Sequence, residues 1–342
     1  MYKLAFYADG GQTLGMGHIM RSLSLAKAFT RHGAQVAFFS RYPEGIAKVR
    51  EEGYLVYTLP SNQFEAKSII SELEGKAFDI LVVDHYEVTP SFFLAIKPYA
   101  KVLVYIDDLN AYRYPVDIII NGNITGEYLK YEALYEEQVF LLGPQYNLIR
   151  EEFKGLPQRH VNKSVRDILI TTGGSDPHHL TEWIIQAIRS EPRMKEISLH
   201  VVIGNSFQFD EQLKKKLNSD NHIHFYKNIA RISELMLRAD LAISSSGSTL
   251  YELCACGVPT LGFIMADNQQ MISEQMDQCG FIKSMGWYTE VSSRQLIDNL
   301  KHLMDDYITR QEMVSKQQSL VDGKGTERIV EKIISHLLEK GM

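Results

Sequence analysis

The chain has 342 residues, of which 45% are hydrophobic, which is enough for two domains that each bury a core. Its formal charge of -6 comes with scattered lysines and arginines, so no basic face for a nucleic acid is expected. The longest apolar runs have the length of core strands, far below the roughly 20 residues of a membrane span, and the first residues do not resemble a signal peptide. The three cysteines have neither zinc-site nor disulfide-framework spacing, which predicts reduced thiols and a cytoplasmic protein without stable membrane association.

Strand-like runs alternate with helical patterns through the first half of the chain, which is typical of parallel βαβ units. The strands predicted there are Lys3–Ala8, Gln35–Ser40, Tyr54–Leu59, Asp79–Asp84, Val102–Asp107 and Asp117–Ile120. A polar, irregular stretch, "KGLPQRHVNKSVRD", follows and indicates a linker. We therefore expect the first domain at residues 1–155.

The alternation resumes with "ILITTGG" and predicts a second domain at residues 163–342. Its strands are expected near Ile168, Val201, His224, Ala242, Leu261 and Ile282, and helical segments from Ser292 and from Thr326 close the chain. The predicted fold class is α/β, with two doubly wound Rossmann-like domains facing across a cleft. Ligands of such folds bind at the carboxyl ends of the strands.

A glycine-rich loop, "ADGGQTLGMGHIM", follows the first strand. Met20 stands where a dinucleotide-binding fingerprint has its third glycine, so no nicotinamide dinucleotide cofactor is predicted. The lysine of a P-loop is absent as well, which argues against triphosphate hydrolysis. Gly15 and Gly17 instead let the backbone approach a ligand closely, with His18 in the first turn of the next helix. Because the positive end of a helix disfavours a charged imidazole, we expect a largely neutral His18 that can accept a proton. The alternative is a tight turn that His18 caps, or a His18 in solvent.

A second motif, "ADLAISSSGSTLYELCACGVP", lies in the C-terminal half. Gly247, Ser248 and Thr249 open a helix that is predicted to end at Gly257, and such a helix start favours a phosphate or diphosphate. Glu252 lies four residues after Ser248 on the same side of this helix, where its carboxylate could accept both hydroxyls of a ribose. The alternative for Glu252 is an ordinary solvated glutamate.

Two further loops predict ligand contacts at the same sheet edge. In "TTGGSDP", Gly173, Gly174 and Ser175 precede a helix and offer backbone amides for a diphosphate. In "MADNQQ", Asn268 and Gln269 begin another helix, where side-chain amides can hydrogen bond a sugar.

No metal site is expected from the remaining candidate ligands. His178 and His179 are adjacent, so they cannot both face one metal ion well. Asp107 and Asp108 end a strand without the partner carboxylates of a magnesium site, and we interpret this pair as turn-forming or substrate-contacting.

With these motifs assembled, the chain resembles the family of UDP-2,4-diacetamido-2,4,6-trideoxy-β-L-altropyranose hydrolases of pseudaminic acid biosynthesis, together with the spore coat polysaccharide protein SpsG. The motifs that carry the resemblance are "ADGGQTLGMGHIMRSLSLA", "VVDHY", "GPQYNLIREEF", "TTGGSDP", "ADLAISSSGSTLYELCACGVP" and "DNQ". The resemblance implies the GT-B fold and metal-independent release of UDP from a UDP-linked (di)acetamido-deoxy sugar, in nonulosonic acid or spore coat polysaccharide biosynthesis.

The same resemblance implies roles for individual residues. It places the general base, which activates water for attack at C1, on His18, a supporting hydroxyl on Tyr86 and an active-site amide on Asn268. It also implies that the uracil meets the backbone near Ile229. The expected substrate- and UDP-binding residues are Gly15, Gly17, Arg21, Gly173, Gly174, Ser175, Ile229, Gly247, Ser248, Thr249, Glu252 and Gln269. Where many relatives have further glycines before Ser248, this chain has Ser244, Ser245 and Ser246, which changes the expected phosphate loop.

Two other functions are compatible with the same motifs. A UDP-sugar-dependent GT-B glycosyltransferase would share the fold and the UDP site and differ only in its acceptor. A non-catalytic nucleotide-sugar sensor would bind without turnover. In each case the expected partner is a UDP-sugar, and no oligomeric state is predicted.

Overall fold

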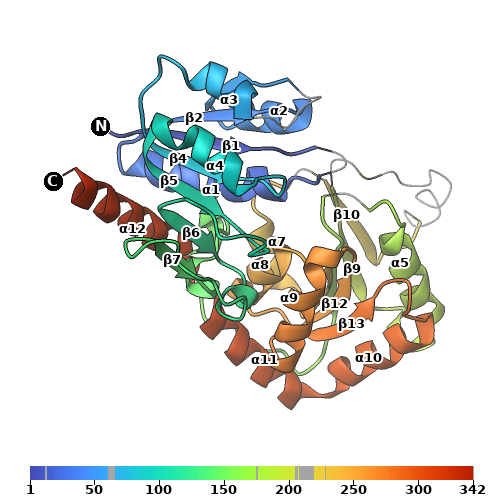
Figure 1. Ribbon diagram of the computed structural model, residues 1–342. Helices are drawn as coiled ribbons and strands as arrows, with labels where there is room; N and C mark the ends of the chain where they lie inside the picture. Colours follow the sequence, from blue (N-terminus) through green and yellow to red (C-terminus); the bar gives the residue numbers. More distant parts are fainter. Residues whose placement is uncertain are drawn as a thin grey trace. The chain divides into compact units, whose positions relative to one another are not determined.

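The computed structural model describes residues 1–11, 14–60, 66–174, 176–204, 207, 219–227 and 229–341. The chain divides into two compact units: Met1–Glu151 with Gly323–Met342, and Glu152–Asp322. Each unit contains a parallel sheet with helices packed against it (Figure 1).

The sheet of the first unit has the strand order β3-β2-β1-β4-β5-β6-β7, and its paired strands are parallel. The strands are β1 Lys3–Ala8, β2 Gln35–Ser40, β3 Leu55–Thr58, β4 Phe78–Asp84, β5 Ala100–Ile106, β6 Ile118–Asn121 and β7 Val139–Leu142. The chain runs outward from β1 to β3 and then returns to place β4 on the other side of β1. The carboxyl ends of β1 and β4 therefore flank the point where the winding reverses, which is where open α/β sheets bind ligands.

Both faces of this sheet are covered, which explains the nearly continuous apolar runs of its central strands. Successive residues of a strand point to opposite faces, so Leu4 and Phe6 join one hydrophobic cluster while Ala5 and Tyr7 join another. The helices and 3-10 turns of the unit are α1 Gly17–Arg31, α2 Pro43–Glu51, α3 Ala66–Leu73, α4 Pro90–Ile96, η1 Lys97–Tyr99, η2 Ile124–Glu127, η3 Pro144–Tyr146 and α12 Gly325–Lys340, and η4 Glu151–Phe153 lies at the boundary between the units.

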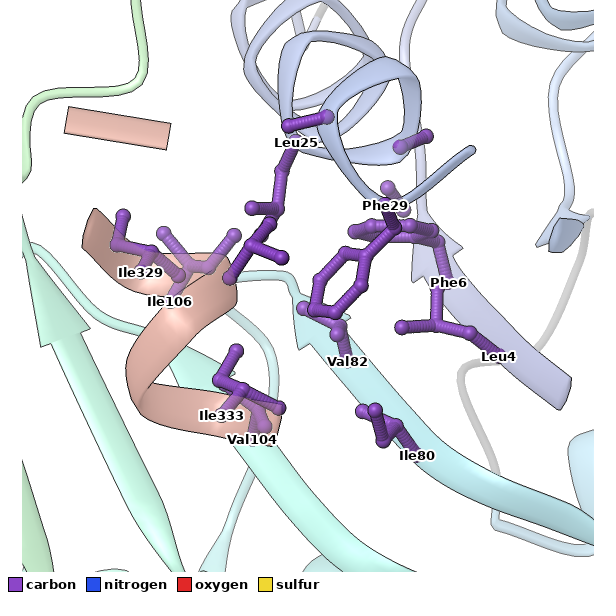
Figure 2. Close-up of a cluster of buried hydrophobic side chains, with 14 of the residues drawn as sticks. Leu4, Phe6, Leu25, Phe29, Ile80, Val82, Val104, Ile106, Ile329 and Ile333 are labelled. Atoms are coloured by element: carbon purple, nitrogen blue, oxygen red, sulfur yellow. The ribbon is translucent and has the colours of Figure 1, made fainter. Parts of the chain in front are cut away.

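The C-terminal helix α12 belongs to the first unit, whereas the sequence predicts it in the second. Ile329 and Ile333 of α12 are fully buried in the cluster that also contains Val104 and Ile106 of β5. Figure 2 shows these four side chains together, with Leu25 and Phe29 of α1 in the same cluster. The predicted domain ranges 1–155 and 163–342 are therefore wrong at the C-terminus, because the apolar face of α12 completes the core under β5.

The sheet of the second unit has the order β10-β9-β8-β11-β12-β13 and is also parallel. Its strands are β8 Asp167–Thr171, β9 Ser198–Ile203, β10 Ile223–Lys227, β11 Leu241–Ser245, β12 Thr260–Ile264 and β13 Lys283–Trp287. Its helices are α5 Leu180–Ser190, η5 Pro192–Met194, α7 Ile232–Arg238, α8 Thr249–Cys256, α9 Asp267–Gln278, α10 Ser293–Asp305 and α11 Tyr307–Leu320. Here the strand order reverses between β8 and β11. The predicted phosphate loops follow these two strands, so they flank the point where sheets of this type bind ligands.

Two elements differ from the sequence prediction. The strand β7, "VFLL", is not predicted, because its four residues lie between polar segments without a recognisable pattern. The helical segment predicted from Ser292 is two helices, since Asp306 ends α10 and its side chain accepts a hydrogen bond from the amide of Thr309 at the start of α11.

Candidate active site

His18 and Asp84 form a hydrogen-bonded pair at the carboxyl ends of β1 and β4. His18 lies in the first turn of α1, Asp84 is the last residue of β4, and His18 Nδ1 is 2.6 Å from Asp84 Oδ1. Parallel pairing of β1 with β4 sets Ala8 beside Asp84, so the helix that follows β1 starts near this carboxylate. The side chain of Asp84 is fully buried, and His18 is only 8% exposed. The sequence left open that His18 caps a turn or lies in solvent, and the structure shows neither arrangement.

The ionisation of Asp84 determines which imidazole nitrogen carries the proton. Burial alone would raise the pKa of Asp84, but the charges of Arg21 and His18 and their hydrogen bonds hold it well below its usual range. An ionised carboxylate only accepts, so the Nδ1–H of His18 donates to Asp84, and in the neutral form of the ring the lone pair is on Nε2. In the part of the chain that the structure describes, no hydrogen bond to Nε2 is present.

Arg21 lies between two carboxylates. Its Nε donates to Asp84 Oδ2 at 2.7 Å and its Nη2 to Asp84 Oδ1 at 2.5 Å. Its Nη1 lies 2.9 and 2.8 Å from the two oxygens of Asp108. The predicted substrate ligand Arg21 thus directs its guanidinium at protein carboxylates. Its Nη2 is also 3.2 Å from His18 Nδ1, where two donors share one oxygen of Asp84.

Tyr86, for which the resemblance implies a supporting hydroxyl, lies against His18. The two rings meet edge to face with their centroids 4.5 Å apart. The Tyr86 hydroxyl donates to Asp108 Oδ2 at 2.8 Å, and 38% of the tyrosine is exposed. The structure therefore brings together three of the predicted residues, His18, Tyr86 and Arg21, and adds two carboxylates that join them.

A second charged cluster, which sequence reasoning missed, lies beside the first. Asp9 accepts from the backbone amide of Arg41 at 2.7 Å and from Arg41 Nε at 2.6 Å, and Arg41 Nη2 lies 2.7 Å from His85 Nε2. Burial raises the pKa of Asp9, but hydrogen bonds from His85 and Arg41 lower it below its usual value. The rings of His85 and His18 are nearly parallel, 6.5 Å apart. The signal for both clusters is a carboxylate at the end of a buried strand, Asp84 as the last residue of β4 and Asp9 directly after β1.

The glycines of the first loop have structural reasons. A Cβ on Gly10 would lie 2.7 Å from Ile19 Cγ1, so a side chain there would push α1 away from the loop. Gly15 adopts φ +73° and accepts a backbone hydrogen bond from Gly11 across the loop. Gly17 is the first residue of α1, and among the described residues no atom lies within 4 Å of its added Cβ. The tight-turn interpretation thus holds for Gly10 and Gly15, while the open side at Gly17 leaves room for a ligand.

In the second unit, the start of α8 has an open side. Its buried residues are Leu250, Tyr251, Leu253, Cys254, Ala255 and Cys256. Thr249 and Glu252 are half-buried, and Ser248 before the helix is exposed, so these three predicted ligands share the open side. Gly257 ends the helix in the left-handed conformation with φ +63°, as predicted.

The loops after β8, β11 and β12 come together at one edge of the sheet. A Cβ on Gly247 would lie 3.7 Å from Gln269 Nε2, and a Cβ on Gly173 would lie 3.7 Å from Ser245 Oγ. Gln269 Oε1 accepts from a backbone amide of its own loop, so its Nε2 is the group that faces Gly247. The structure therefore gathers Gly173, Gly247 and Gln269 as the sequence predicts.

Ser244, Ser245 and Ser246 before this loop are buried. Ser244 and Ser246 are fully buried, and their hydroxyls bond to Ser245 O and Ser273 Oγ within the unit, each at 3.0 Å. The side chains of Ser244 and Ser246 therefore bond within the unit.

The remaining predicted residues occupy the loops around this edge. Gly174 lies against Gly204, where an added Cβ would come within 2.2 Å of the Gly174 carbonyl oxygen. Ile229 is half-buried between β10 and α7, and Asn268 is exposed in the first turn of α9. Ser175 lies outside the described residues.

Over the described ranges, no three His, Cys, Asp or Glu side chains converge as metal ligands. The described helices include none that is long and apolar enough to cross a bilayer.

Comparison with known proteins identifies relatives over most of the chain. Residues 168–332 match the model of the glycosyltransferase family 28 C-terminal domain. The spore coat polysaccharide biosynthesis protein SpsG of Bacillus subtilis is 26% identical over 95% of this chain and 96% of its own length. The UDP-2,4-diacetamido-2,4,6-trideoxy-β-L-altropyranose hydrolase of Campylobacter jejuni is 27% identical over 82% of this chain and 97% of its own.

The chain is a homologue of SpsG and of the altropyranose hydrolase. The resemblance predicted from its motifs is thereby confirmed. The uncharacterized protein MJ1062 of Methanocaldococcus jannaschii is 32% identical over 76% of this chain, but the match spans only 55% of that protein's length. The crystal structure of Acinetobacter baumannii MurG superimposes with a TM-score of 0.69 at 15% identity, covering 97% of this chain and 99% of MurG. This homologue of SpsG thus has the predicted GT-B fold with two Rossmann-like domains.

Proposed function

We propose that this protein hydrolyses a UDP-linked acetamido-deoxy sugar, releasing UDP and the free sugar. The observation that carries the proposal is the pair of His18 and Asp84, which keeps the imidazole Nε2 available as a proton acceptor. Support comes from the Campylobacter jejuni relative, whose name states this reaction for a UDP-2,4-diacetamido-2,4,6-trideoxy sugar.

In the proposed reaction, the first unit activates water. The oxygen of a water molecule forms a bond to C1 of the sugar while its proton passes to His18 Nε2, a general-base contribution of about 10²- to 10⁴-fold. Asp84 fixes the tautomer and stabilises the imidazolium that forms. Gly15 and Gly17 bring the loop backbone close to the sugar. Tyr86 supports the imidazole of His18 through the contact between the two rings.

The second unit takes the leaving group. As the bond from C1 to the diphosphate oxygen breaks, its electron pair stays on that oxygen, and the diphosphate gains negative charge. We assign this charge to the backbone amides at Gly174 and to Ser248 and Thr249 at the start of α8, and the ribose to Glu252. Ile229 contacts the uracil, and Asn268 and Gln269 contact the sugar. No metal ion takes part in this proposal.

Biosynthesis of a nonulosonic acid or of a spore coat polysaccharide in the cytoplasm is the corresponding cellular role. The name of SpsG supports the spore coat polysaccharide, and the other parts of this role rest on the resemblance of the motifs.

A glycosyltransferase is the second candidate. The match to the glycosyltransferase family 28 C-terminal domain favours it. In that case a hydroxyl of a second substrate, instead of water, would lose its proton to His18.

The test is incubation with a panel of UDP-amino sugars in EDTA without any acceptor, with UDP and free sugar measured separately. Equal amounts of both products support hydrolysis without a metal ion. His18→Asn should lower turnover by about 10²-fold or more while UDP affinity stays within a few-fold. His32→Asn, at the other end of α1, is the matched control and should behave as wild type. Release of UDP only after a sugar or lipid acceptor is added would replace the proposal by the transferase.

A further inference from the structure

Asp108 connects three segments of the first unit. It lies two residues after β5, and its carboxylate accepts hydrogen bonds from Arg21 on α1, from Tyr86 after β4 and from Asn123 after β6. The distance from Asn123 Nδ2 to Asp108 Oδ1 is 2.7 Å, and that from Tyr86 Oη to Asp108 Oδ2 is 2.8 Å.

The carboxylate of Asp108 has little capacity left for a substrate. A carboxylate offers about four lone-pair sites on its two oxygens. Oδ1 accepts from Arg21 and Asn123, and Oδ2 accepts from Arg21 and Tyr86. Asp108 therefore acts through its partners, and not as a direct ligand of the sugar.

We infer that Asp108 is a positioning residue that sets both the place of Tyr86 and the electrostatic field at His18. The inference rests on the proposed function. Tyr86 meets the His18 ring edge to face, with its hydroxyl bonded to Asp108, so the carboxylate holds one wall of the site. Through Arg21, the same carboxylate shares a guanidinium with Asp84, which bonds the imidazole.

The charge balance around His18 makes this role measurable. The charged and titratable groups that face the imidazole are Asp84 at the end of β4, Arg21 on the same helix, and His85 and Tyr86 after β4. Arg21 now divides its positive charge between two carboxylates. Neutralising Asp108 removes one of them, so the guanidinium is less compensated beside the imidazole and disfavours the protonated ring.

The test compares wild type with Asp108→Asn by NMR titration of the His18 side chain, assigned with His18→Asn. We expect the midpoint of the imidazole titration to move to lower pH by about 0.5 unit or more in Asp108→Asn. Glu127→Gln removes a carboxylate from the segment that follows Asn123 and should leave the midpoint in place. An unchanged midpoint in folded Asp108→Asn would overturn the inference.

A double-mutant cycle gives a second readout, on turnover. Asp108→Asn should lower kcat by about 10- to 100-fold, the range for residues that orient a functional group, with KM within about threefold. The double variant with Tyr86→Phe should lose no more than the worse single variant, because both changes break one contact. Additive losses, or a raised KM at unchanged kcat, would contradict a positioning role.

Two controls separate the possible failures. If Asp108→Asn does not fold, as judged by circular dichroism, Asp108→Glu keeps the charge and should keep the titration midpoint while lowering kcat. A titration midpoint of His18 that differs between folded Asp108→Glu and wild type would contradict the inference. The titration needs no turnover, so a wild type that releases no UDP would refute the proposed function without deciding the role of Asp108 in the field at His18.

Discussion

The proton on His18 is placed by a carboxylate 66 residues away in the sequence. Asp84 is buried and ionised, and it accepts from both His18 and Arg21. Such a carboxylate holds the imidazole in the tautomer that can take a proton and stabilises the charge that follows. The proposed reaction therefore depends on Asp84 as much as on His18.

Replacement of Asp84 by asparagine should lower kcat by about 10²- to 10⁴-fold. The amide can present its NH₂ group to Nδ1 and so favour the opposite tautomer, in which Nε2 carries the proton. UDP affinity should stay within a few-fold. Asp79→Asn, near the start of the same strand, is the control and should retain activity. A kcat for Asp84→Asn within threefold of wild type would remove the pair from the mechanism.

The ribose contact assigned to Glu252 gives a binding prediction. Glu252→Ala should weaken UDP binding by about 1 to 3 kcal/mol, the range for the loss of a hydrogen bond to a charged group. Titration calorimetry measures this directly, with Glu312→Ala on the exposed side of α11 as control. Unchanged affinity would make Glu252 the solvated glutamate that the sequence also allows.

Sequence reasoning found the residues of this site that stand in recognisable motifs and missed their partners. His18 follows a glycine loop, and Ser248 before α8 follows a strand, so local pattern was sufficient to single out both. Asp84 and Asp9 are single carboxylates at strand ends, and their partners are known only once β1 is placed beside β4 and β2. Strand order is a long-range property that one sequence does not specify.

The element that the sequence misplaced, α12, completes the core of the first unit. Its buried stripe would fit either sheet by periodicity alone, so only the structure shows that Ile329 and Ile333 pack under β5 (Figure 2). The same reasoning explains why most strands and helices could be predicted while the unit to which α12 belongs could not.

Ile333→Ala should destabilise the first unit by about 2 to 5 kcal/mol, since it leaves a cavity in a fully buried cluster. Hydrogen exchange of peptides from β1 and from β11 reports on the two units separately. Faster exchange is expected in β1 with little change in β11. Ile308→Ala on α11, at a side chain that is 60% exposed, should change neither. Faster exchange in β11 alone in Ile333→Ala would mean that α12 packs in the second unit and would contradict this prediction.

His336 on α12 makes the first unit sensitive to acid. Burial, together with the charge of Lys340, lowers the pKa of His336 below its usual value, and its buried Nε2 has no hydrogen-bond partner among the described residues. The unfolded chain therefore binds this proton more readily than the folded one, and stability is lost as pH falls below about 6.5.

His336→Leu should remove this part of the pH dependence. Urea unfolding at pH 7.5 and pH 5.5 should show a smaller loss of stability for the variant than for wild type, while His32→Leu on α1 keeps the wild-type difference. If His336→Leu loses as much stability as wild type between pH 7.5 and pH 5.5, this explanation of the acid sensitivity is wrong.

At the scale of the whole molecule, both units place their polar groups by the same rule. Each has a parallel sheet whose winding reverses between two strands, β1 and β4 in the first unit and β8 and β11 in the second. The predicted base follows one of these points, and the predicted diphosphate loops follow the other. In the proposed reaction the two tasks belong to different units, so loss of His18 should spare UDP affinity and loss of Glu252 should spare the proton acceptor.

The most direct test of the central claim, that water activated by His18 attacks C1 of the sugar, is turnover in ¹⁸O-labelled water. The account predicts UDP without label and label in freshly released sugar, because the bond between C1 and oxygen breaks. UDP is the decisive product, since the anomeric oxygen of a free sugar can exchange with solvent. Label in the terminal phosphate of UDP would mean attack at phosphorus and would contradict the account.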